Sequence, residues 1–215
     1  MHDMLIVKFG GSSIPPFDLA RWVGAVEESS RPTVVVPGGG PFAGTVRRLQ
    51  SQIGFDNDAA REMTLLAMEQ FARALCSIGT RLDPCDSEEA ILRTLSEGRI
   101  AVWLPTRSAM STDDPVWDTT MSSDGFAARL ASRFPGATLC LVKRIDLPEG
   151  RDLHAVTAAG VVDPAFETML HPATRLYVAG PSELSLAGRR LAKGQVPGQE
   201  VVREDDLHTM HEAAQ

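Results

Sequence analysis

The chain is poor in cysteine and in aromatic residues. Its 215 residues include three cysteines, one tyrosine and an aromatic share of 6%. An odd number of cysteines excludes a fully paired disulfide framework, and Cys76, Cys85 and Cys140 lack the paired spacing of a metal site. We therefore interpret them as reduced thiols in a cytoplasmic protein, and we assign no metal held by protein ligands.

The chain also lacks long apolar runs and a surplus of positive charge. No run is long enough to span a bilayer, and the N-terminus has neither the basic start nor the apolar centre of a signal peptide. With 21 Lys and Arg against 28 Asp and Glu, the formal net charge is −7. An acidic chain of this kind is a poor partner for a nucleic-acid backbone. We expect neither nucleic acid nor membrane as a partner.

Apolar runs and amphipathic stretches alternate along the chain, as in an α/β protein. We predict strands at 4–8, 33–36, 100–104 and 139–142, with weaker strand signals at 160–163, 175–179 and 200–203. The predicted fold is a three-layer sandwich with a central, mainly parallel sheet. We expect a single domain over 1–203, which is long enough for one sizeable core, and a polar tail over 204–215.

Three of the predicted helices have an apolar face with helical spacing. The first is capped by Asp18, and the third is long, covering about 58–78. The residues expected to face inward are Leu19, Trp22, Val23 and Val26 in the first helix, Phe42, Val46, Leu49 and Ile53 in the second, and Met63, Leu66, Ala67, Phe71, Ala74, Leu75 and Ile78 in the third. Gln70 falls on the same face of the third helix and would need a polar partner there.

Two glycine-rich turns near the N-terminus carry most of the functional information. The first is Gly10-Gly11-Ser12, which follows an apolar run that contains Lys8, and the second is Gly38-Gly39-Gly40, which follows a run of valines. A glycine turn between a strand and a helix presents backbone N–H groups, and the helix N-terminus adds partial positive charge. Two such turns predict two phosphate-bearing ligands that meet end to end.

The parallel sheet also gathers charged residues from distant parts of the chain. Ligands of open α/β sheets bind beyond the carboxyl ends of the strands, where both glycine turns lie. The segments after Leu104 and after Val142 leave their strands at the same edge, so we expect Asp118, Asp124 and Lys143 to join Lys8 and the glycines there.

Structural explanations for the same residues remain open. Either glycine turn can be a plain turn, and Asp118 or Asp124 can be a helix N-cap. The pair Lys143-Arg144 can be a solvated strand end.

The motifs together resemble the amino acid kinase family, which includes acetylglutamate, aspartate, uridylate and carbamate kinases. The resemblance rests on Lys8-Phe9-Gly10-Gly11-Ser12, on Pro37-Gly38-Gly39-Gly40, and on Ser123-Asp124 before Ala127-Ala128, and it extends over about 5–202. It implies an amino acid kinase-like (carbamate kinase-like) fold and an ATP-dependent phosphotransferase acting on a small phosphorylated or carboxylated metabolite. It also implies Mg²⁺ carried by the nucleotide, and a homodimer or higher homo-oligomer, with the helix at 58–78 as the candidate interface.

The resemblance also assigns roles to single residues. Lys8 would contact the transferring phosphoryl group, Lys143 would be the second cation, and Asp124 would orient the two lysines. The N–H groups of Gly10, Gly11 and Ser12, together with Asp146, would bind the nucleotide. The remaining positions, which would bind the acceptor substrate, are Gly38, Gly39, Gly40 and Asp118.

One stretch departs from the family pattern. The nucleotide-side motif threonine-aspartate-valine-aspartate-glycine is replaced by Lys143-Arg144-Ile145-Asp146-Leu147, and the later lysine of many members has no counterpart. This departure leaves open a catalytically weak, nucleotide-binding, regulatory or storage protein as the alternative.

Four other stretches indicate a subgroup. Residues 36–43, 67–70, 117–124 and 141–143 resemble the aminomethylfuran-phosphate kinases of methanofuran biosynthesis. Those enzymes convert a phosphomonoester to a diphosphate. The resemblance therefore implies aminomethylfuran-methyl phosphate as the acceptor substrate.

Overall fold

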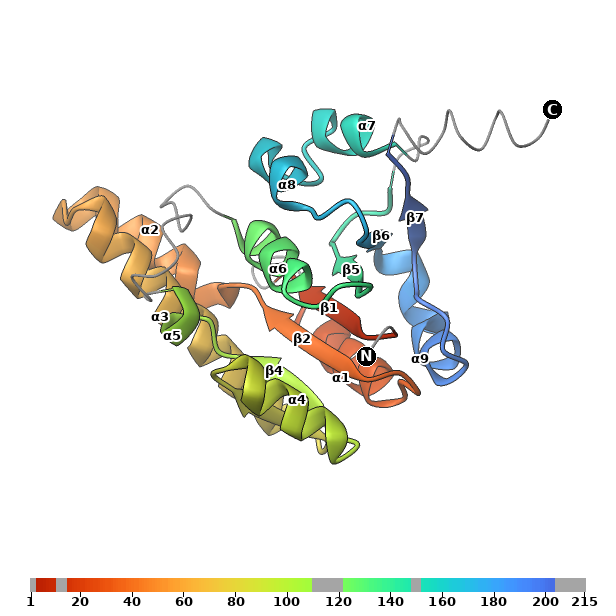
Figure 1. Ribbon diagram of the computed structural model, residues 1–215. Coiled ribbons are helices and arrows are strands. Elements are labelled where there is room, and N and C mark those ends of the chain that lie inside the picture. Colours follow the sequence, from red (N-terminus) through yellow and green to blue (C-terminus); the bar gives the residue numbers. More distant parts are fainter. Residues whose placement is uncertain (1–2, 11–14, 110–121, 148–151, 204–215) are drawn as a thin grey trace.

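The computed structural model describes residues 3–10, 15–109, 122–147 and 152–203. Their centre is a seven-stranded sheet of order β3-β4-β2-β1-β5-β6-β7 (Figure 1). The strands are β1 (Leu5–Phe9), β2 (Thr33–Pro37), β3 (Leu82–Cys85), β4 (Ile100–Trp103), β5 (Thr138–Val142), β6 (Arg175–Ala179) and β7 (Gln199–Val201). Every pairing is parallel except that of β6 with β7, which is antiparallel. The predicted mainly parallel sheet is confirmed.

Helices cover both faces of this sheet (Figure 1). The described helices are α1 (Pro16–Glu27), α2 (Gly40–Ile53), α3 (Asn57–Ile78), α4 (Glu88–Ser96), α5 (Thr106–Ala109), α6 (Ser123–Ser132), α7 (Leu153–Ala158), α8 (Pro164–Met169), the 3₁₀ helix η1 (Pro181–Glu183) and α9 (Leu184–Ala192). Apolar residues of α1 and α9 pack on one face, and those of α4, α6, α7 and α8 pack on the other. Helix α3 contributes to both cores, so the three-layer arrangement follows directly from the packing.

Side-chain alternation along β1 explains why both faces are apolar. Leu5, Val7 and Phe9 belong to the core that contains α1, whereas Ile6 belongs to the opposite core. Successive side chains of a strand point to opposite faces, so a strand covered on both sides is apolar throughout. The exception is Lys8, which is buried and lies one residue before the carboxyl end of β1. A buried lysine requires a nearby negative charge.

Side-chain caps fix the starts of several helices. The carboxylate of Asp56 accepts a hydrogen bond from the backbone N–H of Ala59 at the start of α3, and Ser122 accepts one from Gly125 at the start of α6. These bonds satisfy N–H groups that have no partner within the helix. Helix α1 differs from the prediction, because it begins at Pro16 after an N-cap at Pro15, and Asp18 lies in its first turn without capping it.

One strand prediction was wrong, and one strand was missed. Residues 160–163 form a turn before α8, where Val161 and Val162 are buried without joining the sheet. Strand β3 was missed because its sequence Leu82-Asp83-Pro84-Cys85 contains two residues that are disfavoured in strands. Proline is tolerated there because β3 lies at the edge of the sheet.

The inward faces of α2 and α3 were predicted only in part. Val46, Phe71 and Leu75 are buried as expected, while several residues expected to be buried are exposed, namely Phe42, Ile53, Met63, Leu66 and Ile78. Gln70 is exposed as well, so it needs no buried partner. A homo-oligomer formed through α3 stays a prediction.

Among the helices that the structure describes, none combines the length and apolar character needed to cross a bilayer.

Candidate active site

The carboxyl ends of three adjacent strands bring the glycine turns and a lysine together. Strand β1 lies between β2 and β5, with Lys8 opposite Val36 on one side and Leu141 on the other. Each strand therefore ends at about the same level, where β1 leads to Gly10, β2 to Gly38 and β5 to Lys143. The N-terminus of α6 reaches the same place and carries Asp124 in its first turn.

Asp124 lies between two ammonium groups. Its Oδ1 is 2.7 Å from Nζ of Lys8, and its Oδ2 is 2.5 Å from Nζ of Lys143. Lys143 also donates a hydrogen bond of 2.5 Å to the carbonyl oxygen of Val161. The side chains of Lys8 and Asp124 are 5% and 9% exposed, so this pairing is shielded from water. The lysines come from neighbouring strands, so the sheet itself sets their separation.

Burial and charge act in opposite directions on these groups. Burial by itself would raise the pKa of Asp124, but the charges of Lys8 and Lys143 outweigh it, and the pKa of Asp124 is lowered. Burial lowers the pKa of Lys143, and Asp124 opposes that shift only in part. The carboxylate therefore stays ionised and pairs with both ammonium groups. The role of Asp124 in orienting the lysines for catalysis stays a prediction.

The glycines of the second turn allow close backbone packing at the N-terminus of α2. A Cβ on Gly39 would lie 2.2 Å from Cβ of Ala43. Gly40 has φ +56°, and a Cβ there would lie 2.8 Å from the ring of Phe71. Gly38 donates its N–H to the carbonyl oxygen of Phe9 at 2.9 Å, which ties this turn to the end of β1. The chain can therefore turn directly from β2 into α2, whose N-terminus opens onto the site.

The first turn is described up to Gly10. Its N–H donates to the carbonyl oxygen of Val142 at 3.3 Å, and a Cβ on Gly10 would lie 3.1 Å from that oxygen. Gly11 and Ser12, which were predicted to bind nucleotide phosphates, lie outside the described residues, as does the predicted substrate-binding Asp118.

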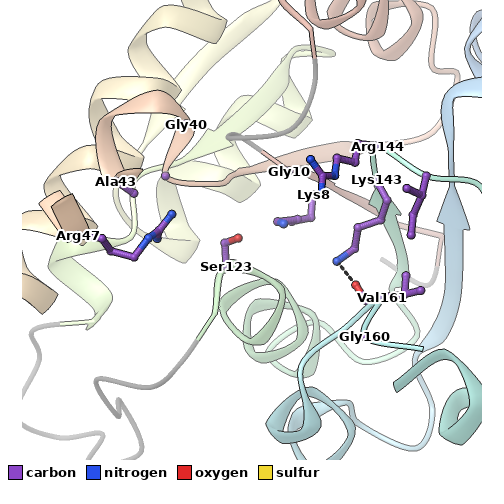
Figure 2. Close-up of a pocket in the computed structure, with 12 residues that line it drawn as sticks. Lys8, Gly10, Gly40, Ala43, Arg47, Ser123, Lys143, Arg144, Gly160 and Val161 are labelled. Carbon is purple, nitrogen blue, oxygen red and sulfur yellow. Dashed lines mark hydrogen bonds between the residues drawn. The ribbon is translucent and has the colours of Figure 1, made fainter. Parts of the chain in front are cut away.

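A cavity of about 320 Å³ joins these features (Figure 2). Within the described parts of the chain, its lining contains four Lys or Arg residues and no Asp or Glu, although the whole chain carries −7. The lining residues are Lys8, Gly10, Gly39, Gly40, Ala43, Arg47, Ser123, Lys143, Arg144, Ile145, Gly160 and Val161. The N-termini of α2 and α6 both reach this cavity and add partial positive charge. Its chemistry therefore suits ligands of high negative charge.

Asp146 has a structural partner. Its Oδ1 accepts hydrogen bonds from the backbone N–H of Ser182 at 3.1 Å and from the hydroxyl of Ser182 at 2.6 Å. A Cβ on Gly180 would lie 2.2 Å from the same oxygen. Asp146 therefore connects the loop after β5 to the start of η1, and its predicted part in nucleotide binding stays a prediction.

Sequence reasoning assigned no site role to three polar residues of the cavity lining. Arg47 lies on α2, Ser123 begins α6, and Arg144 follows Lys143. Gly40, Ala43 and Arg47 occupy positions i, i+3 and i+7 of one helix, and this spacing places Arg47 on the same helix face as the turn. The lysine count was a second unused signal, because Lys8 and Lys143 are two of only three lysines in the chain.

Comparison with known proteins tests the resemblance directly. A model of the amino acid kinase family matches residues 3–83, which include both glycine turns and Lys8. The chain is also similar to a uridylate kinase from Archaeoglobus fulgidus, with a TM-score of 0.68 and 13% identity over 93% of this chain and all of that one. The resemblance to the amino acid kinase family is confirmed. The fold is therefore the amino acid kinase fold.

Two further proteins show how far the likeness extends. An aspartate kinase from Synechocystis has a TM-score of 0.61 and 16% identity, and the match covers 93% of this chain and 40% of that one. A protein of Methanocaldococcus jannaschii, named [5-(aminomethyl)furan-3-yl]methyl phosphate kinase, is 24% identical over 181 residues, which are 78% of this chain and 82% of that one.

Proposed function

We propose that this protein is an ATP-dependent kinase that phosphorylates a small phosphomonoester, with [5-(aminomethyl)furan-3-yl]methyl phosphate as the acceptor. The observation that carries the proposal is the cationic cavity around Lys8, Asp124 and Lys143, where the chain's two buried or half-buried lysines share one carboxylate. The named relative from Methanocaldococcus jannaschii supports the choice of acceptor.

The reaction needs positioning and positive charge more than it needs a base. An oxygen of the acceptor's phosphate attacks the γ-phosphorus of ATP, a new P–O bond forms, and the bond from the γ-phosphorus to the β,γ-bridging oxygen breaks. The products are ADP and a diphosphate monoester. The attacking oxygen is already ionised at neutral pH, so no proton has to be removed. Negative charge on the moving phosphoryl group is what the protein has to stabilise.

Lys8 and Lys143 are suited to that task because both are held before any ligand arrives. An ammonium group has three N–H donors. Asp124 holds Lys8 through an ion pair, and Lys143 donates hydrogen bonds to Asp124 and to the carbonyl oxygen of Val161. The remaining donors are available to phosphate oxygens in the cavity. Preorganised donors in a shielded site stabilise developing charge without having to reorganise.

The two ends of the cavity suit two different ligands. The N-terminus of α2, with Gly39 and Gly40, would receive the acceptor, and the side formed by Gly10, Lys143 and Arg144 would receive the phosphates of ATP. Gly10 fits this role because a Cβ at that position would lie only 3.1 Å from the carbonyl oxygen of Val142. Gly11, Ser12 and Asp146 complete the proposed nucleotide contacts, and Asp118 completes those to the acceptor.

Mg²⁺ fits this site as part of the nucleotide complex. The carboxylate beside the cavity, Asp124, is already engaged by two ammonium groups. Within the described ranges, no group of three or more His, Cys, Asp or Glu side chains is arranged to hold a metal ion. When bound with ATP, Mg²⁺ would neutralise part of the charge on the phosphates.

The direct test is ADP release from Mg-ATP in the presence of defined acceptors. We expect release with [5-(aminomethyl)furan-3-yl]methyl phosphate and a new diphosphate detectable by ³¹P NMR, and no release with UMP, aspartate or N-acetylglutamate. Release with one of these other acceptors would reject the proposed substrate but retain the kinase. Nucleotide binding without ADP release from any acceptor would favour the alternative, a nucleotide-binding family member without phosphotransfer.

A further inference from the structure

Among the charged residues that line the cavity, Arg47 is the one that the reaction described above does not yet use. It lies on α2 and lines the cavity together with Gly40 and Ala43. In Figure 2 its side chain extends from α2 toward Ser123, on the side of Lys8 away from Arg144. Its guanidinium makes no hydrogen bond or ion pair with any group that the structure describes. An arginine on the wall of a cationic cavity that has no partner among the described residues is available to a ligand.

The geometry of α2 brings this guanidinium back to the glycine turn. Arg47 lies seven residues, or about two helical turns, beyond Gly40. Helical side chains lean toward the N-terminus of their helix, so a long side chain at this position reaches back along its own face. Ala43 lies between the two and its small side chain leaves that path open. Arg47 and the N-terminus of α2 therefore face the same part of the cavity.

We infer that Arg47 is the residue that makes the site specific for phosphomonoester acceptors, by gripping two oxygens of the phosphate that is to be phosphorylated. The inference rests on the proposed function and names the chemical feature of the acceptor that the protein recognises. The planar guanidinium matches two oxygens of one phosphate with two parallel hydrogen bonds.

The count of oxygens separates phosphates from carboxylates. A phosphomonoester has three terminal oxygens, so Arg47 can hold two of them while the third attacks ATP. A carboxylate has two, so a two-point grip would occupy the attacking oxygen itself. Acceptors that react through a carboxylate are therefore at a disadvantage in this cavity, for a reason that does not depend on the rest of the acceptor.

The neighbouring Arg48 provides a matched control. It has the same side chain on the same helix and is exposed, but it does not line the cavity. Arg47→Ala removes the grip, and Arg47→Lys keeps the charge without the two-point geometry. Arg48→Ala changes the net charge of α2 by the same amount as Arg47→Ala.

The experiment combines binding and turnover in these variants. Calorimetric titrations with benzyl phosphate and with phenylacetate measure recognition without any reaction, and steady-state assays give separate KM values for ATP and for [5-(aminomethyl)furan-3-yl]methyl phosphate. In Arg47→Ala we expect Kd for benzyl phosphate and KM for the furan phosphate to rise at least tenfold, the usual scale for a lost charged hydrogen-bond pair. KM for ATP should change less than twofold, whereas Kd for phenylacetate should rise as well, because the same guanidinium would hold the two oxygens of its carboxylate. Arg47→Lys should recover only part of the loss, and Arg48→Ala should behave as the wild type.

Three results would overturn the inference. The first is an equal loss of affinity for benzyl phosphate in Arg47→Ala and Arg48→Ala, and the second is wild-type affinity in Arg47→Lys. The third is that the wild type binds neither benzyl phosphate nor the furan phosphate at millimolar concentration. The binding arm also separates this inference from the proposed function. Arg47-dependent binding of benzyl phosphate without ADP release would reject the kinase and keep the phosphate subsite. ADP release that does not depend on Arg47 would keep the kinase and reject the phosphate subsite.

Discussion

Nζ of Lys143 lies 2.5 Å from Oδ2 of Asp124, although 19 residues separate them in the chain. Strand β5 delivers the lysine and helix α6 delivers the carboxylate, so the contact forms only when the helix is packed on the sheet. Lys8 reaches the other oxygen of the same carboxylate from β1. The site is thus a product of the folded core, and its charges can be tested one at a time.

Lys8→Met should abolish most of the phosphotransfer while leaving the protein folded. Methionine fills nearly the same volume but supplies no donor to the transferring phosphoryl group. Removing one preorganised donor costs a factor of about 10²–10³ in kcat. The measurement is kcat for ADP release, with thermal unfolding as the check on folding. Lys193, the exposed third lysine, gives the control Lys193→Met, which should keep wild-type kcat. A Lys8→Met protein with more than a tenth of wild-type kcat would contradict the role of Lys8.

Asp124→Asn should destabilise the protein, because it leaves two ammonium groups side by side without their carboxylate. Removing one partner of a buried ion pair costs about 3–5 kcal/mol. Urea unfolding at pH 7 measures the difference between wild type and variant. A difference below about 1 kcal/mol would contradict a structural role for the pairing.

The same difference should depend on pH in a defined direction. Burial would raise the pKa of Asp124, but the two lysines lower it overall. A group with a lowered folded-state pKa stabilises the fold above its unfolded pKa of about 3.9, and that stability is lost as the pH falls through the folded value. The gap in unfolding free energy between wild type and Asp124→Asn should therefore be constant at neutral pH and shrink in acid below about pH 4. A gap that widens in acid would show that the carboxylate is not the stabilising form.

Lys143 should set the alkaline limit of activity. Burial lowers its pKa, and Asp124 opposes the shift only in part. Since the neutral amine cannot stabilise a phosphoryl group, kcat/KM should fall as the pH rises through a value below the usual lysine pKa of about 10.4. Arginine stays charged throughout this range, so Lys143→Arg should move the alkaline limb to higher pH, whatever activity remains. The control Lys193→Arg should leave the alkaline limb of kcat/KM where it is in the wild type. If Lys143→Arg also leaves that limb unchanged, the titration belongs to another group.

Much of this site could be predicted because its signals are local in the sequence. A strand followed by a glycine turn is visible without any tertiary information, and the parallel sheet then places all strand ends together. On that basis Lys8, Asp124 and Lys143 were expected at one edge, and the structure brings both lysines within ion-pair distance of Asp124. Their catalytic roles stay predictions until the variants are measured.

The rest could not be predicted because it depends on packing. Whether an apolar residue on α2 or α3 is buried depends on which face of the helix packs against the rest of the protein. Phe42 and Leu66 are exposed. Strand β3 is held by its pairing with β4, which outweighs its poor local propensity. Arg47 was overlooked for a similar reason, because its helical spacing from Gly40 becomes informative only once the orientation of α2 is known, and that orientation places Arg47 on the cavity wall.

In the turn between β2 and α2, we predict that one substitution destabilises the protein and that a second substitution restores the lost stability. Gly39 has φ −72° and ψ −2°, a conformation open to any residue, so alanine there is not strained by its backbone. Its Cβ would nevertheless lie 2.2 Å from Cβ of Ala43. Gly39→Ala should therefore lower the free energy of unfolding by about 1–3 kcal/mol, the usual cost of an overpacked site. It should also weaken acceptor binding at the N-terminus of α2.

Ala43→Gly removes the atom that causes this clash. Alone, it should cost about 1 kcal/mol, the usual helix penalty of glycine relative to alanine. The double variant Gly39→Ala/Ala43→Gly should be more stable than the sum of the two single losses, by about the energy of the clash. Urea unfolding of all four proteins measures this coupling, and acceptor KM should recover with it. Strictly additive losses would show that Gly39 is required for another reason, such as a direct approach of the ligand to the backbone at that position.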